Sequence, residues 1–293
     1  MASVEFLVIG GTGMLGQALL RELDIQDRPA IGLARTNADL CLDIANDDLL
    51  LKTINEVQPA VIVNAAAMVD LDKCEKRPDL SYLYNSRVSS ILSSYCTSNH
   101  IKYVYISTDH YYTGDAKKKH TENHSVNLSN EYSRTKYVGE QLSLTHSESL
   151  VVRTNIVGFR YQENNLTFIE WAIQALKNNE TQTFFNDFYT SSVDVVSFSK
   201  SLLDLIDKGT KGIVNLSASE VFSKLELITA LATQLDLSLE NINSGSVLNM
   251  PSKTQRNESL GLDVSKAEKI LGYSLPTLSD VVSNLANEYL DRR

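Results

Sequence analysis

Tyr132 and Lys136 have the residue types and the spacing of a proton-transfer pair. On a helix, side chains one turn apart leave from the same face, so the phenol and the ammonium would lie close together. A nearby positive charge favours the ionised phenol and lowers its pKa, which lets a tyrosine exchange a proton with a substrate oxygen. Because this spacing is common by chance, the prediction depends on where the fold places the pair.

A run of β-branched and aromatic residues, Tyr103–Ile106, precedes this pair and is typical of a strand. The run ends at Ser107, Thr108 and Asp109. Ligands of open parallel sheets bind beyond the carboxyl ends of the strands. We therefore expect the Thr108 hydroxyl to hold a carbonyl oxygen beside Tyr132.

A glycine-rich turn follows the first apolar run, Phe6–Ile9, and opens a segment with helical periodicity. Its GxGxxG spacing allows a tight turn and lets backbone N–H groups approach a diphosphate at the positive end of the helix. The strand, turn and helix occur in the order that this motif requires. We predict that a dinucleotide cofactor binds at Gly10, Gly11, Thr12, Gly13, Met14, Leu15 and Gly16.

Arg35 follows the second expected strand, Ala30–Leu33, where an acidic residue would bind the 2′-hydroxyl of the adenosine ribose. A guanidinium at this position neutralises a 2′-phosphate instead. NADP(H) is therefore the preferred cofactor, with NAD(H) as the alternative, although Arg35 also fits a solvated surface position. Small side chains follow another strand, where the nicotinamide ribose has to pass: Ala65, Ala66 and Ala67.

Strand-like and helical segments alternate through the first half of the chain, which predicts a parallel sheet with helices on both faces. The helical segments include Asp43–Val57, Leu80–Ser98 and Tyr132–Leu144. We expect a Rossmann-type doubly wound α/β domain over residues 1–158. Residues 159–293 are expected to form a smaller α+β substrate lobe, from which some segments return to the sheet. The last helix is expected to begin at a Ser279–Asp280 cap.

Several stretches together resemble the extended short-chain dehydrogenase/reductases: Gly10–Gly16, Asp43–Ile44, Asn64–Ala67, Ser107–Asp109 and Tyr132–Lys136. Within that superfamily the sequence is similar to the dTDP-4-dehydrorhamnose reductases and related sugar-nucleotide-modifying proteins. The resemblance covers residues 4–158 well and continues more loosely through Asp187–Asp194 and residues 262–267.

The resemblance implies an oxidoreductase that uses NADPH to reduce a keto sugar nucleotide in cell-surface polysaccharide or deoxysugar biosynthesis. The substrate that fits it best is dTDP-4-dehydrorhamnose. Tyr132 would donate the proton, Lys136 would bind the nicotinamide ribose and tune Tyr132, and Thr108 would orient the substrate carbonyl.

The resemblance also implies cofactor and substrate contacts. Asp43 and Ile44 would lie against the adenine, and Asn85 would approach the active site from a neighbouring helix. This chain departs from the family pattern on the sugar side, where Ile156 replaces an aromatic residue, so the chemistry is better defined than the substrate. The side chains expected to bind substrate are Asp109, His110, Asn155, Asp187 and Arg256. For Arg256, which lies in a polar loop, a solvated surface position is an equally good interpretation.

Two other functions stay open. A dehydratase or epimerase could share this fold; dehydratases carry a glutamate where this chain has His110, but a histidine can act as the base of an epimerisation. A non-catalytic, cofactor-binding regulatory subunit is the second alternative. The presence of Thr108, Tyr132 and Lys136 argues against it.

Composition excludes several further classes. The 293 residues carry a net charge of −9, which argues against a nucleic-acid-binding surface. The 3 cysteines are widely spaced, as expected in a reducing compartment, and no metal site is predicted because His120 and His124 lack a third ligand. Neither a signal peptide nor a membrane span is expected. We therefore expect a cytoplasmic protein whose partner is a nucleotide sugar, and a homodimer remains open.

Overall fold

The structure is a computed structural model that describes residues 4–163, 165–249 and 254–291. The chain forms two compact units. Unit 1 comprises Met1–Thr108, Leu128–Arg153 and Leu202–Val214, and unit 2 comprises Asp109–Asn127, Thr154–Ser201 and Asn215–Arg293. The units thus alternate along the chain, and the functional division at residue 158 into a cofactor domain and a substrate lobe stays a prediction.

Unit 1 is built on a seven-stranded sheet in the order β11-β6-β5-β4-β1-β2-β3. Strands β3, β2, β1, β4, β5 and β6 run parallel, with Val8 opposite both Gly32 and Val63. The strand order reverses between β1 and β4, which is where ligands bind in doubly wound sheets. The strands are β1 (Phe6–Ile9), β2 (Ala30–Ala34), β3 (Leu40–Cys41), β4 (Val61–Asn64), β5 (Lys102–Ile106), β6 (Leu150–Arg153) and β11 (Gly212–Asn215).

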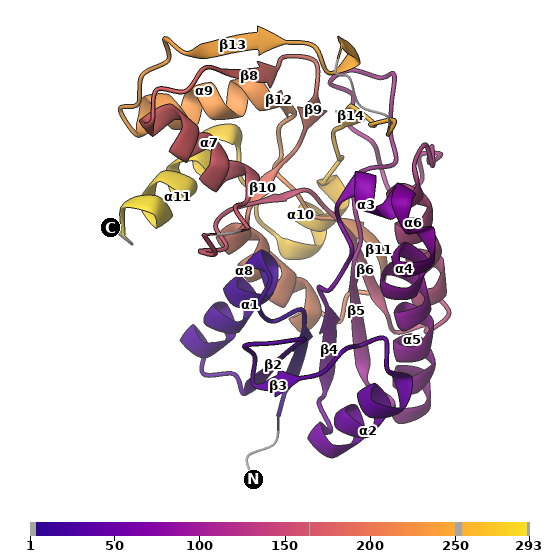
Figure 1. Ribbon diagram of the computed structural model, residues 1–293. Coiled ribbons are helices and arrows are strands. Elements are labelled where there is room, and N and C mark those ends of the chain that lie inside the picture. The colour runs from indigo at the N-terminus through magenta and orange to yellow at the C-terminus, as the bar shows by residue number, and fades with distance from the viewer. Residues whose placement is uncertain (1–3, 164, 250–253, 292–293) are drawn as a thin grey trace. The chain divides into compact units, whose positions relative to one another are not determined.

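Helices cover both faces of this sheet, as Figure 1 shows for α1 on one side and α5 and α6 on the other. Apolar strand residues such as Leu7, Ile62 and Tyr103 are fully buried between these layers. The helical segments are α1 (Met14–Ile25), α2 (Asp47–Val57), α3 (Leu71–Lys76), α4 (Pro78–Tyr82), the π-helix η1 (Leu83–Arg87), α5 (Val88–Asn99) and α6 (Glu131–Ser143). This architecture confirms the predicted Rossmann-type doubly wound α/β fold.

Unit 2 is an α+β assembly of nearly the same size as unit 1. A three-stranded sheet has the order β12-β9-β14, and two further strand pairs, β10-β7 and β13-β8, complete its β-structure. Its core joins α7, α9 and α11 through buried residues such as Ile173, Leu231 and Leu285. The elements are β7 (Ile156–Val157), α7 (Phe168–Lys177), β8 (Gln182–Phe185), β9 (Tyr189–Thr190), β10 (Val193–Asp194), β12 (Phe222–Ser223), α9 (Lys224–Gln234), β13 (Ile242–Gly245), the 3₁₀-helix η2 (Val247–Asn249), β14 (Ser259–Leu260), α10 (Ser265–Leu271) and α11 (Leu278–Leu290). Helix α8 (Val195–Asp207) begins in unit 2 and continues into unit 1 from Leu202.

Several helix boundaries differ from the sequence prediction because polar side chains cap the helices. Helix α2 begins only at Asp47, because the Asn46 side chain accepts a hydrogen bond from the backbone N–H of Leu49. In the same way, Thr277 caps α11, so Asp280 lies inside its first turn and not at the cap. The helix expected over residues 80–98 is interrupted by the π-helical turn η1.

Across the three described ranges, no helix combines the length and the apolar composition that crossing a bilayer requires.

Candidate active site

Helix α6 carries both members of the proposed proton-transfer pair into the interior of unit 1. Its start is set by Asn130 and Ser133, which form a reciprocal capping box. Tyr132 is 8% exposed and Lys136 is 2% exposed. The Lys136 ammonium donates a hydrogen bond of 2.6 Å to the backbone carbonyl of Ile106, the last residue of β5. The lysine is therefore anchored at the carboxyl end of a central strand.

The surroundings of Lys136 change the pKa of its ammonium. Its ammonium lies 4.1 Å from the centre of the Tyr105 ring, a cation–π contact. Burial lowers the pKa of Lys136 to about 7, although the negative charge of Glu140 acts in the opposite direction. A lysine with this pKa exchanges its proton near neutral pH.

Thr108 lies at the same end of β5, two residues beyond Ile106, and is 3% exposed. The preceding residue, Ser107, is held by two hydrogen bonds. Its backbone N–H donates to the Val152 carbonyl at 2.7 Å, and its hydroxyl donates to Glu140 Oε2 at 2.9 Å. The structure thus brings Thr108 and α6 together in one unit.

A buried ion pair that the sequence analysis did not identify supports this arrangement. Glu140, on α6, is fully buried and binds Arg153, at the end of β6, at 2.6 Å. Since Ser107 binds the same carboxylate, one side chain joins α6, β5 and β6. No sequence motif links Glu140 to Arg153, because they lie in different elements. The only signal in the sequence was that Glu140 falls one helical turn after Lys136, on the same face of the helix.

The glycine turn is shaped to hold a diphosphate. Gly10 has a φ of +91°, and a Cβ on Gly16 would lie 2.1 Å from the Gly10 carbonyl oxygen, so a side chain fits at neither position. Helix α1 begins at Met14, and its N-cap residue Gly13 provides no side-chain hydrogen bond; its first turn has no acidic residue. By contrast, α2 and α6 are capped by asparagines. The N-terminus of α1 therefore keeps backbone donors and a positive dipole for an anion.

The residues expected near the adenosine lie at the ends of β2 and β3. Arg35 is exposed directly after β2, and Ile44 is buried. Asp43 accepts a hydrogen bond of 3.0 Å from the hydroxyl of Tyr84. Sequence analysis missed Asp39, whose carboxylate accepts a hydrogen bond of 2.8 Å from the backbone N–H of Gly32. A guanidinium and a carboxylate thus both follow β2.

The chain beyond β4 is held against the glycine turn. The Ala65 N–H donates to the Ile9 carbonyl at 2.9 Å, and the Ala66 nitrogen lies 2.9 Å from where a Gly10 Cβ would be. Asn85, fully buried in η1, binds both backbone groups of Met68, at 2.8 and 3.0 Å. Its amide also lies 3.2 Å from the Thr135 hydroxyl on α6. In this structure Asn85 holds the backbone of Met68 in place. Its approach to a cofactor stays a prediction.

Three of the residues expected on the substrate side lie together in unit 2. Asn155 donates to Asp109 at 2.8 Å, and His110 Nε2 lies 4.0 Å from the Asp109 carboxylate. Burial, together with the positive charges of Lys224 and Arg256, lowers the pKa of His110 to about 4. At neutral pH this imidazole is therefore uncharged.

The other two expected residues have different surroundings. Arg256 belongs to the same group, because its charge acts on His110. Asp187 is not brought there: its carboxylate accepts hydrogen bonds from the Ser246 hydroxyl and, at 2.7 Å, from the Val247 N–H. Sequence analysis missed Lys224, which joins the group through the Ser192 hydroxyl at 3.1 Å.

A doubly wound sheet with a glycine turn after its first strand, and a buried tyrosine–lysine pair one helical turn apart beside β5, defines an extended short-chain dehydrogenase/reductase. Relatives of this chain are named as dTDP-4-dehydrorhamnose reductase and dTDP-4-keto-6-deoxy-D-glucose reductase, which are oxidoreductases, and this chain is an oxidoreductase as well. Within the extended short-chain dehydrogenase/reductases, the chain belongs to the family described as the RmlD substrate binding domain, whose model matches residues 4–290. The resemblance inferred from sequence motifs is confirmed.

Individual relatives are distant but match over nearly the whole chain. A probable low-salt glycan biosynthesis reductase of Haloferax volcanii is 24% identical over 97% of this chain and 98% of its own. The methionine adenosyltransferase 2 subunit beta of Danio rerio is 26% identical over 92% of this chain and 85% of its own. The crystal structure of dTDP-4-dehydrorhamnose reductase from Bacillus anthracis in complex with NADP superposes with a TM-score of 0.88, at 23% identity, covering 98% of this chain and 99% of that one. That likeness confirms the fold.

Proposed function

We propose that this protein reduces a ketone of a nucleoside diphosphate sugar with NADPH, and that dTDP-4-dehydrorhamnose is the substrate that fits best. The observation that carries the proposal is the placement of Lys136 on the Ile106 carbonyl. This contact brings the tyrosine–lysine helix to the end of the strand that leads into Thr108. A proton donor, a cation and a hydroxyl are then available at one sheet edge for a substrate carbonyl.

The proposed residue roles follow from the chemistry of carbonyl reduction. When bound, the nicotinamide supplies a hydride to the carbonyl carbon. Thr108 donates a hydrogen bond that orients the carbonyl oxygen, and Tyr132 gives this oxygen its phenolic proton, so the ketone becomes a secondary alcohol. Lys136, when protonated, stabilises the phenolate that Tyr132 leaves behind.

The cofactor would be held by residues of unit 1 that fit it. The glycine turn and the uncapped start of α1 would bind the diphosphate. Asp43 and Ile44 would contact the adenine, and Arg35 would bind a 2′-phosphate. Ala65, Ala66, Ala67 and Asn85 would border the nicotinamide ribose.

The substrate would be recognised by residues of unit 2. Asp109, His110 and Asn155 form one hydrogen-bonding and electrostatic group in the structure. Hydroxyl groups of a sugar match such a set of donors and acceptors. Asp187 is not included in this group, since the Ser246 hydroxyl and the Val247 N–H, which follow β13, already bind it.

A regulatory role without turnover is the second candidate, because one relative that matches most of the chain is named as a subunit of methionine adenosyltransferase. Intact Thr108, Tyr132 and Lys136 favour the reductase. A dehydratase is less well supported, because this chain has His110 at the position where dehydratases carry a glutamate.

The test is to incubate the protein with NADPH and dTDP-4-dehydrorhamnose and to follow the loss of NADPH absorbance. Tyr132→Phe serves as the matched inactive variant, because it removes the proton and little volume. Turnover by the wild type alone supports the proposal. Failure across a panel of keto sugar nucleotides, with NADPH still bound, contradicts it and favours the regulatory role.

A further inference from the structure

Lys224 is a cation that, in the part of the chain the structure describes, forms no hydrogen bond with an acidic side chain. It is the first residue of α9 and is partly buried, with its ammonium 5.1 Å from the centre of the Phe168 ring and 6.0 Å from that of Phe188. Its hydrogen bond goes to the neutral Ser192 hydroxyl, at 3.1 Å. Among the described residues it forms no ion pair.

The position of Lys224 is unfavourable for folding on two counts. Burial removes water from the ammonium and lowers the pKa of Lys224 to about 8, although Asp109 acts in the opposite direction. The first turn of a helix carries the positive end of the helix dipole, which disfavours a further positive charge. Buried charges in proteins are normally paired, so this lysine requires an explanation outside the fold itself.

Arg256 is a second cation that acts on His110. The Nε atom of Arg256 is buried and binds no acceptor within the described part of the chain. The next residue, Asn257, is fully buried and donates its amide to the His110 carbonyl at 3.1 Å, which holds the Arg256 segment against His110. Both Lys224 and Arg256 act on the imidazole of His110. The surroundings of His110 thus include two cations that bind no acidic side chain within the described part of the chain.

The acidic side chain in this neighbourhood is already engaged. Asp109 accepts the Asn155 amide at 2.8 Å, and Asn155 in turn accepts the Ser192 hydroxyl at 2.7 Å. This chain of hydrogen bonds reaches Lys224 through Ser192 without placing a carboxylate on the ammonium. The group thus carries two positive charges against one negative charge.

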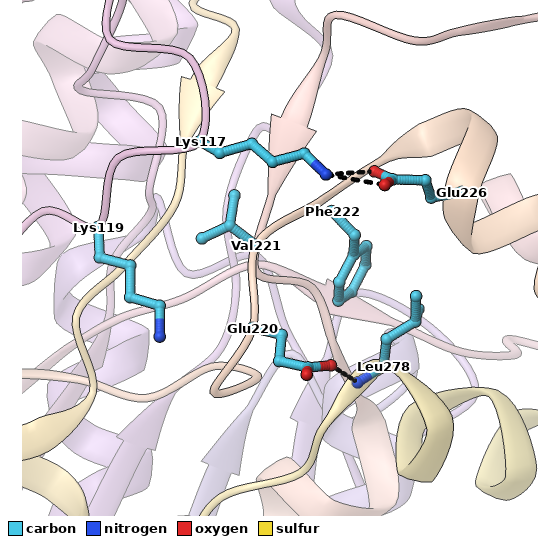
Figure 2. A pocket seen from close by; sticks show the side chains of 7 residues that line it. All are labelled: Lys117, Lys119, Glu220, Val221, Phe222, Glu226 and Leu278. Carbon is cyan, nitrogen blue, oxygen red and sulfur yellow. Dashed lines mark hydrogen bonds and ion pairs between the residues drawn. The ribbon is translucent and has the colours of Figure 1, made fainter.

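Other lysines of unit 2 show what a satisfied cation looks like in this protein. Figure 2 shows a pocket of about 420 Å³ in which Lys117 binds Glu226 at 2.7 Å. Lys119, on the same pocket, donates to the Ser219 carbonyl at 2.6 Å. Because Lys117 is paired with a carboxylate and Lys119 is exposed to solvent, this pocket offers an anion much less than the group around Lys224 does.

We propose that Lys224 and Arg256 form an oxyanion-binding subsite that recognises a negatively charged group of the substrate. The oxyanion is either a phosphate of the nucleoside diphosphate or a carboxylate on the sugar, and both present the same chemistry to an ammonium and a guanidinium. This inference rests on the proposed function for the class of molecule bound, but it does not require that the molecule is reduced.

The test measures binding by calorimetry without NADPH, with thymidine diphosphate, UDP-glucose and UDP-glucuronate as probes. Lys224→Met keeps the apolar stem and removes the charge. Lys200→Met, on an exposed lysine of α8, is the matched control for net charge. Loss of one charge-assisted contact weakens binding roughly 10- to 100-fold. Lys224→Arg, which keeps the charge, should retain most of the affinity.

Two results support the subsite and distinguish its ligand. If Lys224→Met loses affinity for thymidine diphosphate, the oxyanion is a phosphate. If the wild type prefers UDP-glucuronate to UDP-glucose and only Lys224→Met loses this preference, the oxyanion is a carboxylate. The proposal is overturned if Lys224→Met binds every probe as the wild type does, or if the wild type binds none of them.

Protein stability provides an independent readout. A lysine that serves a ligand, and not the fold, can be replaced by methionine without lowering the midpoint of thermal unfolding. A clear drop in this midpoint for Lys224→Met would instead assign the residue a structural role. Because neither measurement involves turnover, the subsite can fail while the reductase activity stands, and the reverse also holds.

Discussion

Glu140 and Arg153 form a two-point ion pair inside unit 1: Arg153 Nε donates to Oε2 at 3.0 Å and a terminal guanidinium nitrogen donates to Oε1 at 2.6 Å. Their side chains are 0% and 3% exposed. Since Glu140 also accepts the Ser107 hydroxyl, the pair connects the helix of Tyr132 and Lys136 to the strand end that carries Thr108.

Removing the charge of Glu140 should therefore destabilise the protein strongly. Glu140→Gln leaves Arg153 buried with an uncompensated charge, and we expect a loss of about 3–5 kcal/mol in the free energy of unfolding, measured by urea denaturation. Ser107→Ala, the matched control, removes one neutral donor and should cost only about 1 kcal/mol. Equal, small effects of both variants would show that the ion pair contributes little.

Tyr132→Phe should abolish most of the reaction while leaving the binary complex intact. The change removes the phenolic proton and almost no volume, so turnover should fall by about 10²–10⁴-fold, the usual contribution of a general acid. NADPH affinity, measured by fluorescence titration, should stay within a few-fold of the wild type. A variant that keeps most of its turnover would remove Tyr132 from the mechanism.

Lys136 should make stability depend on pH above neutrality. Burial lowers its pKa to about 7 in the folded state, so between that pH and the higher pKa of the unfolded state the unfolded chain holds a proton that the folded chain has released. The free energy of unfolding of the wild type, relative to Lys136→Met, should thus be flat below about pH 6 and rise above pH 7. Urea denaturation of both proteins across this range measures the difference. A difference that falls with rising pH contradicts the assignment.

Arg35 should select the phosphorylated cofactor. Titration should show NADPH binding roughly 5- to 100-fold more tightly than NADH, and Arg35→Asp should reverse this order. Asp39→Asn is the informative comparison, because Asp39 also follows β2 and binds the Gly32 N–H. If the wild type prefers NADH and Asp39→Asn loses that preference, cofactor choice depends on Asp39 binding the 2′-hydroxyl of the adenosine ribose and not on Arg35.

Features encoded by short sequence patterns were predictable without the structure. The turn at Gly10–Gly16, the alternation of strands and helices, and the spacing of Tyr132 and Lys136 are local. Parallel strands joined by helices have few allowed topologies, so these local signals were sufficient to place the glycine turn and Thr108 at the carboxyl edge of one sheet.

Contacts between residues distant in sequence were decided by the tertiary structure. The buried pair of Glu140 with Arg153, and the hydrogen-bonded path from Asp109 through Asn155 and Ser192 to Lys224, depend on how elements pack. No periodicity marks such partners, because a buried polar side chain is satisfied by whichever group the fold brings within reach. For the same reason Asp187, which its sequence context placed with the substrate residues, is bound instead by Val247, 60 residues further along the chain. The sequence by itself determined the fold class and the spacing of Tyr132 and Lys136; the packing decided which charges are paired and which lack an acidic partner among the described residues.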